Sequence, residues 1–85
     1  MKLAGGSQVT ARHGFHTTGP FRLTPREIEC LEWLGRGHRV VSIGSKLGIA
    51  STTVVTHLSA ARKKLRAVTR EQALVLALRH RLIDP

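Results

Sequence analysis

The stretch from residue 43 to residue 65 constrains the fold of this chain more than any other part. Gly48 lies in its middle, and glycine readily takes the left-handed backbone conformation in which helices end. Gly44 is small where two helix backbones would come close together. The apolar residues spaced to face each other across the turn are Ile43, Leu47, Ile49 and Val54. This spacing predicts two short helices packed around a tight turn, the helix-turn-helix motif.

The rest of the chain predicts an all-α domain of four helices. A helix over 25–36 begins with Thr24 as its cap, Pro25 at the first helical position and Glu27 completing a capping box. The next two expected helices cover 40–47 and 51–65. A fourth helix over 69–81 has a second capping box, formed by Thr69 and Gln72.

Residues 1–22 contain several glycines and show neither helical nor strand periodicity, so we expect them to form a flexible N-terminal arm. The helix-turn-helix domain is then expected over 23–85.

No run of apolar residues is long enough to span a membrane, and no signal peptide is evident, so we expect a cytoplasmic protein. The single cysteine, Cys30, lies among apolar residues and is expected to be buried. No catalytic dyad or metal-ligand spacing is present, so we expect neither an enzyme nor a cofactor.

The charge of the chain is strongly basic and unevenly distributed. Fourteen Lys and Arg residues against five Asp and Glu give a formal net charge of +9. No acidic residue occurs from Trp33 through Arg70, and Arg62-Lys63-Lys64-Leu65-Arg66 ends the third expected helix. This imbalance is compatible with a solvated basic face, but beside a helix-turn-helix motif it favours a surface that binds the phosphates of double-stranded DNA.

The exposed side of the helix over 51–65 presents short side chains first and cations later, which suits a helix lying in the major groove. The candidate base contacts are Thr52, Val55, Thr56 and Ser59. The candidate phosphate contacts are Thr53, Arg62, Lys63, Arg66, Arg39 and Lys46. No Arg, Asn or Gln occurs from 51 to 59, so we expect modest sequence discrimination for each subunit.

The fourth expected helix has more apolar surface than a small core can cover, because residues 73–78 are all apolar. We expect an inward face made of Ala73, Leu74, Ala77 and Leu82. Val75, Leu76 and Arg79 then remain as the candidate interface of a homodimer.

These residues together resemble the LuxR/GerE-type helix-turn-helix domain of bacterial transcription regulators. The matching positions are Leu23-Thr24-Pro25-Arg26-Glu27, Gly37, Ile43, Leu47, Ile49, Thr53-Val54, His57, Lys64-Leu65, Arg70, Gln72-Ala73 and Leu82-Ile83. The resemblance implies a four-helix fold, a third helix in the major groove and dimerisation through the fourth. Cys30-Leu31 with Trp33 is similar to the quorum-sensing receptors that bind acyl-homoserine lactones. Their ligand domain has no counterpart here, so we expect no small-molecule ligand within this chain.

The chain departs from the family pattern in three places. Arg39-Val40-Val41-Ser42 stands in place of a Ser-Asn-Lys-Glu-like run, Val55 in place of a basic residue, and Ala60-Ala61 in place of an Asn-Ile pair. These differences affect the expected base contacts more than the expected fold.

Two other interpretations stay open beside a dimeric, sequence-specific transcription regulator. The chain also resembles region 4 of sigma factors, although Leu82-Ile83 at the end of the fourth helix argues against that class. Alternatively, the chain is an interaction module that forms a heterodimer with a full-length LuxR-type regulator and blocks it.

Overall fold

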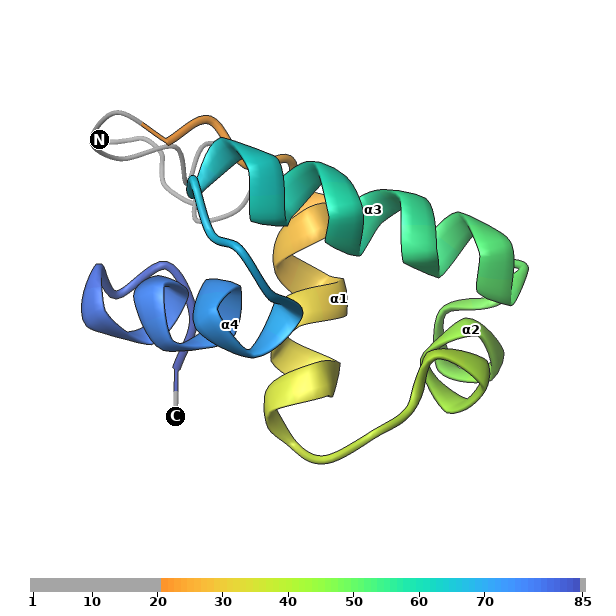
Figure 1. The fold of residues 1–85 in the computed structure, drawn as a ribbon. Coiled ribbons are helices and arrows are strands. Elements are labelled where there is room, and N and C mark those ends of the chain that lie inside the picture. The colour runs from red at the N-terminus through yellow and green to blue at the C-terminus, as the bar shows by residue number, and fades with distance from the viewer. Residues whose placement is uncertain (1–20, 85) are drawn as a thin grey trace, which may run out of the picture.

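The structure is a computed structural model that describes residues 21–84, and this part of the chain folds into four helices without a strand. The helices are α1 (Pro25–Gly35), α2 (Val40–Leu47), α3 (Ser51–Lys64) and α4 (Arg70–Arg79), shown in Figure 1. The all-α prediction is confirmed, and α2 has the predicted bounds.

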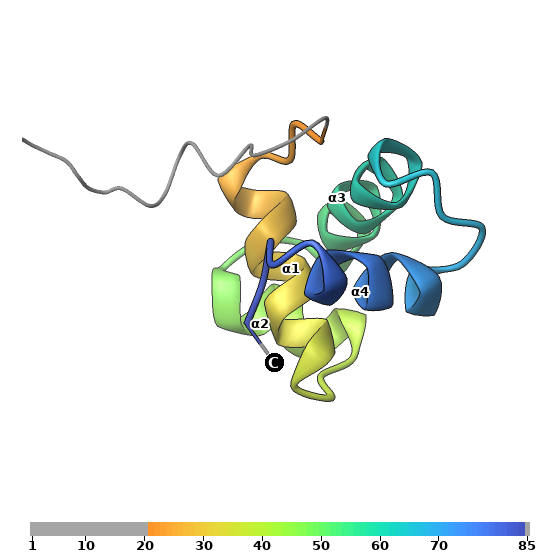
Figure 2. The same ribbon diagram turned by 90° about the vertical axis from the view of Figure 1, so that its left-hand side faces the viewer.

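The longest helix, α3, is the element against which the others pack. It contacts α1, α2 and α4, whereas α2 and α4 do not contact each other within residues 21–84. Figure 1 shows α3 lying across the top of the domain, with α2 below one end and α4 below the other. The turned view in Figure 2 shows α1 passing between α2 and α4 on the inner side of α3. The largest fully buried side chains come from α1, α2, α3 and the segment before α1, and they include Leu23, Leu31, Ile43, Val54 and Leu58.

The start of α1 is fixed by the predicted capping box. The Thr24 hydroxyl accepts a hydrogen bond from the Glu27 amide at 3.1 Å, and the Thr24 amide donates to the Glu27 carboxylate at 2.9 Å. Pro25 occupies the first helical position, where its missing N–H leaves no hydrogen bond unmade.

The turn between α2 and α3 depends on two glycines. Gly48 ends α2 in the left-handed conformation, with φ of +71°. At Gly44 a Cβ atom would lie 2.7 Å from the carbonyl oxygen of Ile49, so no larger residue fits without movement of the backbone. Gly44 thus allows the backbone of residues 49–51 to approach α2 closely, and Gly48 supplies the left-handed residue that ends α2, as the sequence predicted.

The end of α4 corrects the predicted bounds, because this helix stops at Arg79 rather than near Arg81. Arg81 has φ of +58°, and the amide of Leu82 donates to the Ala77 carbonyl at 2.8 Å. This reversal is the Schellman motif, and it buries Leu82 against the core.

At the start of α4, the predicted capping box forms only in part. The Thr69 hydroxyl accepts from the Gln72 amide, but the Gln72 side chain accepts from the amide of Val68 and not from that of Thr69. The first half of the box is sufficient to satisfy one free amide of the first turn.

The predicted N-terminal arm, residues 1–22, lies outside the described residues except for its last two. Phe21 packs against the core, and its ring lies edge to face with that of His80 at a centroid distance of 4.8 Å. The main-chain carbonyl of Arg22 accepts a hydrogen bond from Lys64 of α3. The ordered packing of the described chain therefore begins by Phe21.

Candidate nucleic-acid interface

The helix α3 separates buried from exposed side chains as the sequence predicted. Val54, Leu58 and Ala61 are buried on its inner side. The candidate base and phosphate contacts on the outer side are Thr52, Thr53, Val55, Thr56 and Lys63, which are exposed, and Ser59 and Arg62, which are half-buried. The helix is unbroken from Ser51 to Lys64, so these side chains project from one rigid element.

Hydroxyl and methyl groups dominate the first half of this exposed side. The Thr56 hydroxyl donates to the carbonyl of Thr52 at 3.1 Å, within its own helix. Its oxygen keeps lone pairs that can accept a hydrogen bond from a base amino group. Val55 is 40 % exposed, and its methyl groups suit contact with the methyl group of thymine.

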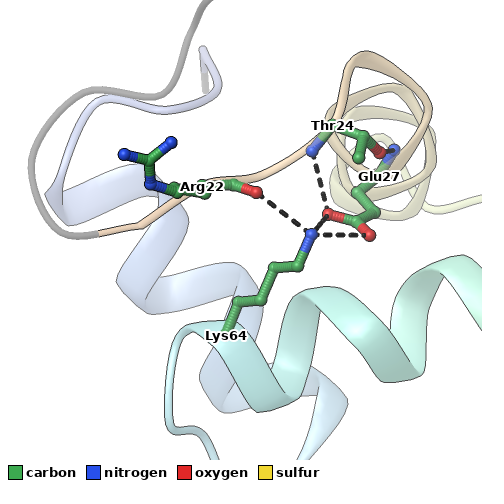
Figure 3. A network of polar contacts seen from close by, with 4 residues as sticks. All are labelled: Arg22, Thr24, Glu27 and Lys64. Carbon is green, nitrogen blue, oxygen red and sulfur yellow. Dashed lines mark hydrogen bonds and ion pairs between the residues drawn. The ribbon is translucent and has the colours of Figure 1, made fainter.

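The four cations from 62 to 66 differ in what they contact, although the sequence grouped them as one cluster. Arg62 donates from Nη1 to the carbonyl of Ala67 at 3.0 Å. Lys64 donates to both carboxylate oxygens of Glu27, at 2.8 and 3.1 Å, as Figure 3 shows. Lys63 and Arg66 are exposed. Two of the four cations thus form contacts within the protein.

The end of α3 is a second Schellman motif with an arginine in the left-handed position. Arg66 has φ of +58°, and the amide of Ala67 donates to the Arg62 carbonyl at 2.9 Å. This backbone turn leads the chain from α3 into α4.

The two candidate cations of α2 lie at its opposite ends. Arg39 is the N-cap and is exposed. Lys46 lies in the last turn, with Nζ 5.2 Å from the centroid of the Trp33 ring. Arg36 lies over the same ring at 4.9 Å, and Trp33 is half-buried against the core. Cation–π attraction therefore holds Lys46 beside the indole in this structure.

A groove of about 260 Å³ extends the exposed side of α3 toward the start of α4. Its lining includes Val55, Ser59 and Arg62 of α3 and Arg70 of α4. Val68, in the connecting loop, is 80 % exposed and also lines it. Arg70 and Val68 were not among the predicted contacts, although Arg70 is one of the basic residues in the long stretch without acids.

The outer side of α4 differs from the prediction at two residues, Leu76 and Leu78. Ala73, Ala77 and Leu82 are buried as expected, and Leu74 is half-buried. Among the predicted interface residues, Val75 and Arg79 are exposed, whereas Leu76 is half-buried and packs against the core. Leu78, which was not predicted, is exposed instead. The helix turns by about 100° for each residue, so Leu78 and Val75 share one side.

The remaining reactive or metal-binding side chains form no metal site in the described part of the chain. Cys30 is fully buried, and burial raises the pKa of its thiol from 9.0 to about 11. Between residues 21 and 84, no three His, Cys, Asp or Glu side chains come together where a metal ion could bind. None of the four helices has both the length and the apolar character needed to cross a membrane.

Comparison with known proteins adds independent information. Residues 22–77 match the model of the family described as bacterial regulatory proteins, luxR family. The chain is 45 % identical over 64 residues to the transcriptional activator protein BjaR1 of Bradyrhizobium diazoefficiens, a match of 75 % of this chain and 26 % of that protein.

Two further relatives extend the comparison. The quorum sensing-dependent transcriptional regulator VjbR of Brucella abortus is 44 % identical over 62 residues, which are 73 % of this chain and 24 % of VjbR. The uncharacterised transcriptional regulatory protein YxjL of Bacillus subtilis is 35 % identical over 72 residues, which are 85 % of this chain and 32 % of YxjL. The chain thus spans about a quarter to a third of the length of these relatives.

Proposed function

This chain belongs to the luxR family of bacterial regulatory proteins, and on that premise we propose that it binds double-stranded DNA in transcription regulation. The observation that supports this most directly is the exposed side of α3, where short hydroxyl and methyl groups are followed by cations. The printed names of the relatives describe transcriptional activators and regulators, and one of them a quorum sensing-dependent regulator. The family match does not favour the sigma-factor or interaction-module alternatives.

We assign sequence reading to the first half of α3, lying in the major groove. Thr52, Thr56 and Ser59 carry hydroxyls that donate to or accept from base edges, and Val55 packs on thymine methyl groups. Each such contact contributes about 1–3 kcal/mol of discrimination where it is well formed. Short side chains bring the helix backbone close to the bases, so the fit depends on the exact seating of α3.

We assign backbone binding to the surrounding cations and to Thr53. Lys63 and Arg66 are exposed at the end of α3, and Arg39 is exposed at the start of α2. Arg62 keeps further N–H donors beside the one that bonds Ala67, so it can contact a phosphate while holding the loop. Lys46 reaches a phosphate by leaving the ring of Trp33, which makes it the weakest member of this set.

We also propose that two copies of the domain pair through α4. Val75 and Leu78 are exposed apolar residues on this helix, and Arg79 lies beside them. Pairing would cover this apolar surface and place two α3 helices on neighbouring half-sites, which multiplies the modest discrimination of a single subunit.

A fluorescence anisotropy titration on labelled duplex DNA at several salt concentrations tests the proposal. Duplexes are first selected from a random pool. For a DNA-binding protein, the logarithm of the association constant falls steeply with the logarithm of salt concentration. We expect Lys63→Ala to reduce the magnitude of this slope by about one unit.

Arg26→Ala serves as the matched control, because it removes the same charge from α1, where Arg26 pairs with Glu29. This control should leave the salt slope of the wild type unchanged. Binding that is independent of salt, or a pool that yields no preferred sequence, would contradict sequence-specific DNA binding.

A further inference from the structure

An ion pair between a nearly buried carboxylate and a partly exposed lysine connects the beginning of α1 to the end of α3. The carboxylate of Glu27 is only 6 % exposed, and it accepts from Lys64 Nζ through both oxygens, at 2.8 and 3.1 Å. The same Nζ donates to the carbonyl of Arg22 at 3.0 Å. Figure 3 shows these three acceptors gathered around the end of the Lys64 side chain.

We propose that Lys64 is a positioning residue for DNA binding and not a ligand of phosphate. This inference rests on the proposed DNA-binding function. Lys64 belongs to the basic run 62–66, whose sequence alone suggests that every cation contacts DNA. The ion pair instead fixes the last turn of α3 against α1, and so sets where Lys63 and Arg66 lie relative to the bases read by the first half of the helix.

The burial of Glu27 explains why Lys64 stays in place. If Lys64 left for a phosphate, a nearly buried carboxylate would lose its cation, and an uncompensated buried charge is strongly unfavourable. Lys63, its neighbour, is exposed and forms no ion pair with another residue in the described part of the chain. Two adjacent lysines therefore have different roles.

Replacement of Glu27 by Gln distinguishes a phosphate-binding Lys64 from a positioning Lys64, because the two roles predict opposite changes in DNA affinity. A glutamine at this position can still accept from the Thr24 amide, so the capping box is retained while the ion pair is lost. If Lys64 were a phosphate ligand restrained by Glu27, the substitution would free it, and DNA affinity and the salt slope would both increase. If Lys64 positions α3, the substitution lowers affinity even though the protein has lost a negative charge.

Glu29→Gln is the matched control, because the Glu29 side chain lies on the same helix and is 47 % exposed, and the charge change is identical. In the duplex titration we expect Glu27→Gln to bind about tenfold more weakly with an unchanged salt slope. Glu29→Gln should bind as tightly as the wild type or slightly more tightly. Circular dichroism at the assay temperature establishes that both variants are folded, so that loss of folded protein does not account for the weaker binding.

If Glu27→Gln does not fold, nuclear magnetic resonance of the lysine side chains in the wild-type protein tests the proposal instead. On titration with duplex DNA, the side-chain ¹⁵Nζ resonance of Lys63 should shift, and that of Lys64 should stay in place. Tighter binding by Glu27→Gln, affinity equal to that of Glu29→Gln, or a Lys64 shift as large as that of Lys63 would overturn the proposal. A wild type that fails to bind duplex DNA would instead reject the proposed function, and this inference with it.

Discussion

Residues of the same type in one short segment acquire different roles according to what lies within their reach. Lys63 and Lys64 are adjacent and both are exposed, yet among the described residues only Lys64 bonds a carboxylate, which comes from a residue 37 positions earlier in the chain. Burial of that carboxylate decides the difference, since a buried charge requires a partner. The effect of a substitution therefore depends on each residue's environment and not on its type.

Two glycines within helices give a prediction at this scale. Gly44→Ala should lower the free energy of unfolding by about 1–2 kcal/mol, because the added Cβ meets the backbone oxygen of Ile49 at 2.7 Å and the gain in helix propensity does not offset that clash. At Gly35 the nearest atom is the end of the Leu74 side chain, at 3.2 Å, which can move aside.

Gly35→Ala is thus the control, and its effect should be near zero or slightly stabilising. Urea denaturation followed by circular dichroism measures both variants. Equal effects of the two substitutions would show that the close approach at Gly44 does not require glycine.

At the scale of the helix, the way in which α3 and α4 end is the feature that leads to a prediction. Both α3 and α4 end in Schellman motifs that place an arginine, and not a glycine, in the left-handed conformation. This conformation costs an ordinary residue roughly 1–2 kcal/mol. Burial of the apolar residue that follows each arginine, Ala67 or Leu82, offsets that cost.

Arg81→Gly should therefore stabilise the domain. We expect a gain of about 0.5–1 kcal/mol, because relief of the left-handed strain exceeds the added entropy of the unfolded chain. Arg79→Gly makes the same chemical change in the last helical residue of α4 and should destabilise the domain by up to about 1 kcal/mol. Thermal unfolding measured for both variants should thus give shifts of opposite sign, and shifts of the same sign would contradict this account.

At the scale of the whole molecule, α2 and α4 lie apart on either side of α1, and each packs on a different part of α3. This arrangement leaves the outer side of α4 available for a second copy without covering the first half of α3. The proposed DNA-binding and pairing surfaces are therefore compatible within one small domain.

Pairing is tested by Val75→Gln combined with Leu78→Gln. We expect the variant to stay folded and to sediment as a monomer, because each substitution removes apolar surface worth about 1 kcal/mol in the paired state. Val41→Gln is the control, since Val41 is 72 % exposed on α2, a helix that does not contact α4. Sedimentation equilibrium should show the control associating like the wild type. A wild-type protein that is monomeric at every concentration tested would remove the basis for pairing.

Local sequence determined where the four helices form, because the caps, turn glycines and apolar periods that specify a helix each involve residues close together in the chain. Thr24, Pro25 and Glu27 are neighbours that form one cap, and Gly44 and Gly48 define one turn. The period of Val54, Leu58 and Ala61 likewise identified the buried side of α3 without any knowledge of its partners. The roles assigned to the exposed residues of that helix remain predictions.

Only the tertiary structure decided which cations are engaged within the protein and which apolar residues of α4 are exposed. Lys64 is engaged because the fold brings Glu27 and Arg22 to it, and Leu76 is half-buried because the core reaches that side of α4. The early end of α4 has the same origin, since Leu82 turns back to the core. These outcomes depend on contacts between residues far apart in the chain, and local periodicity contains no information about such contacts.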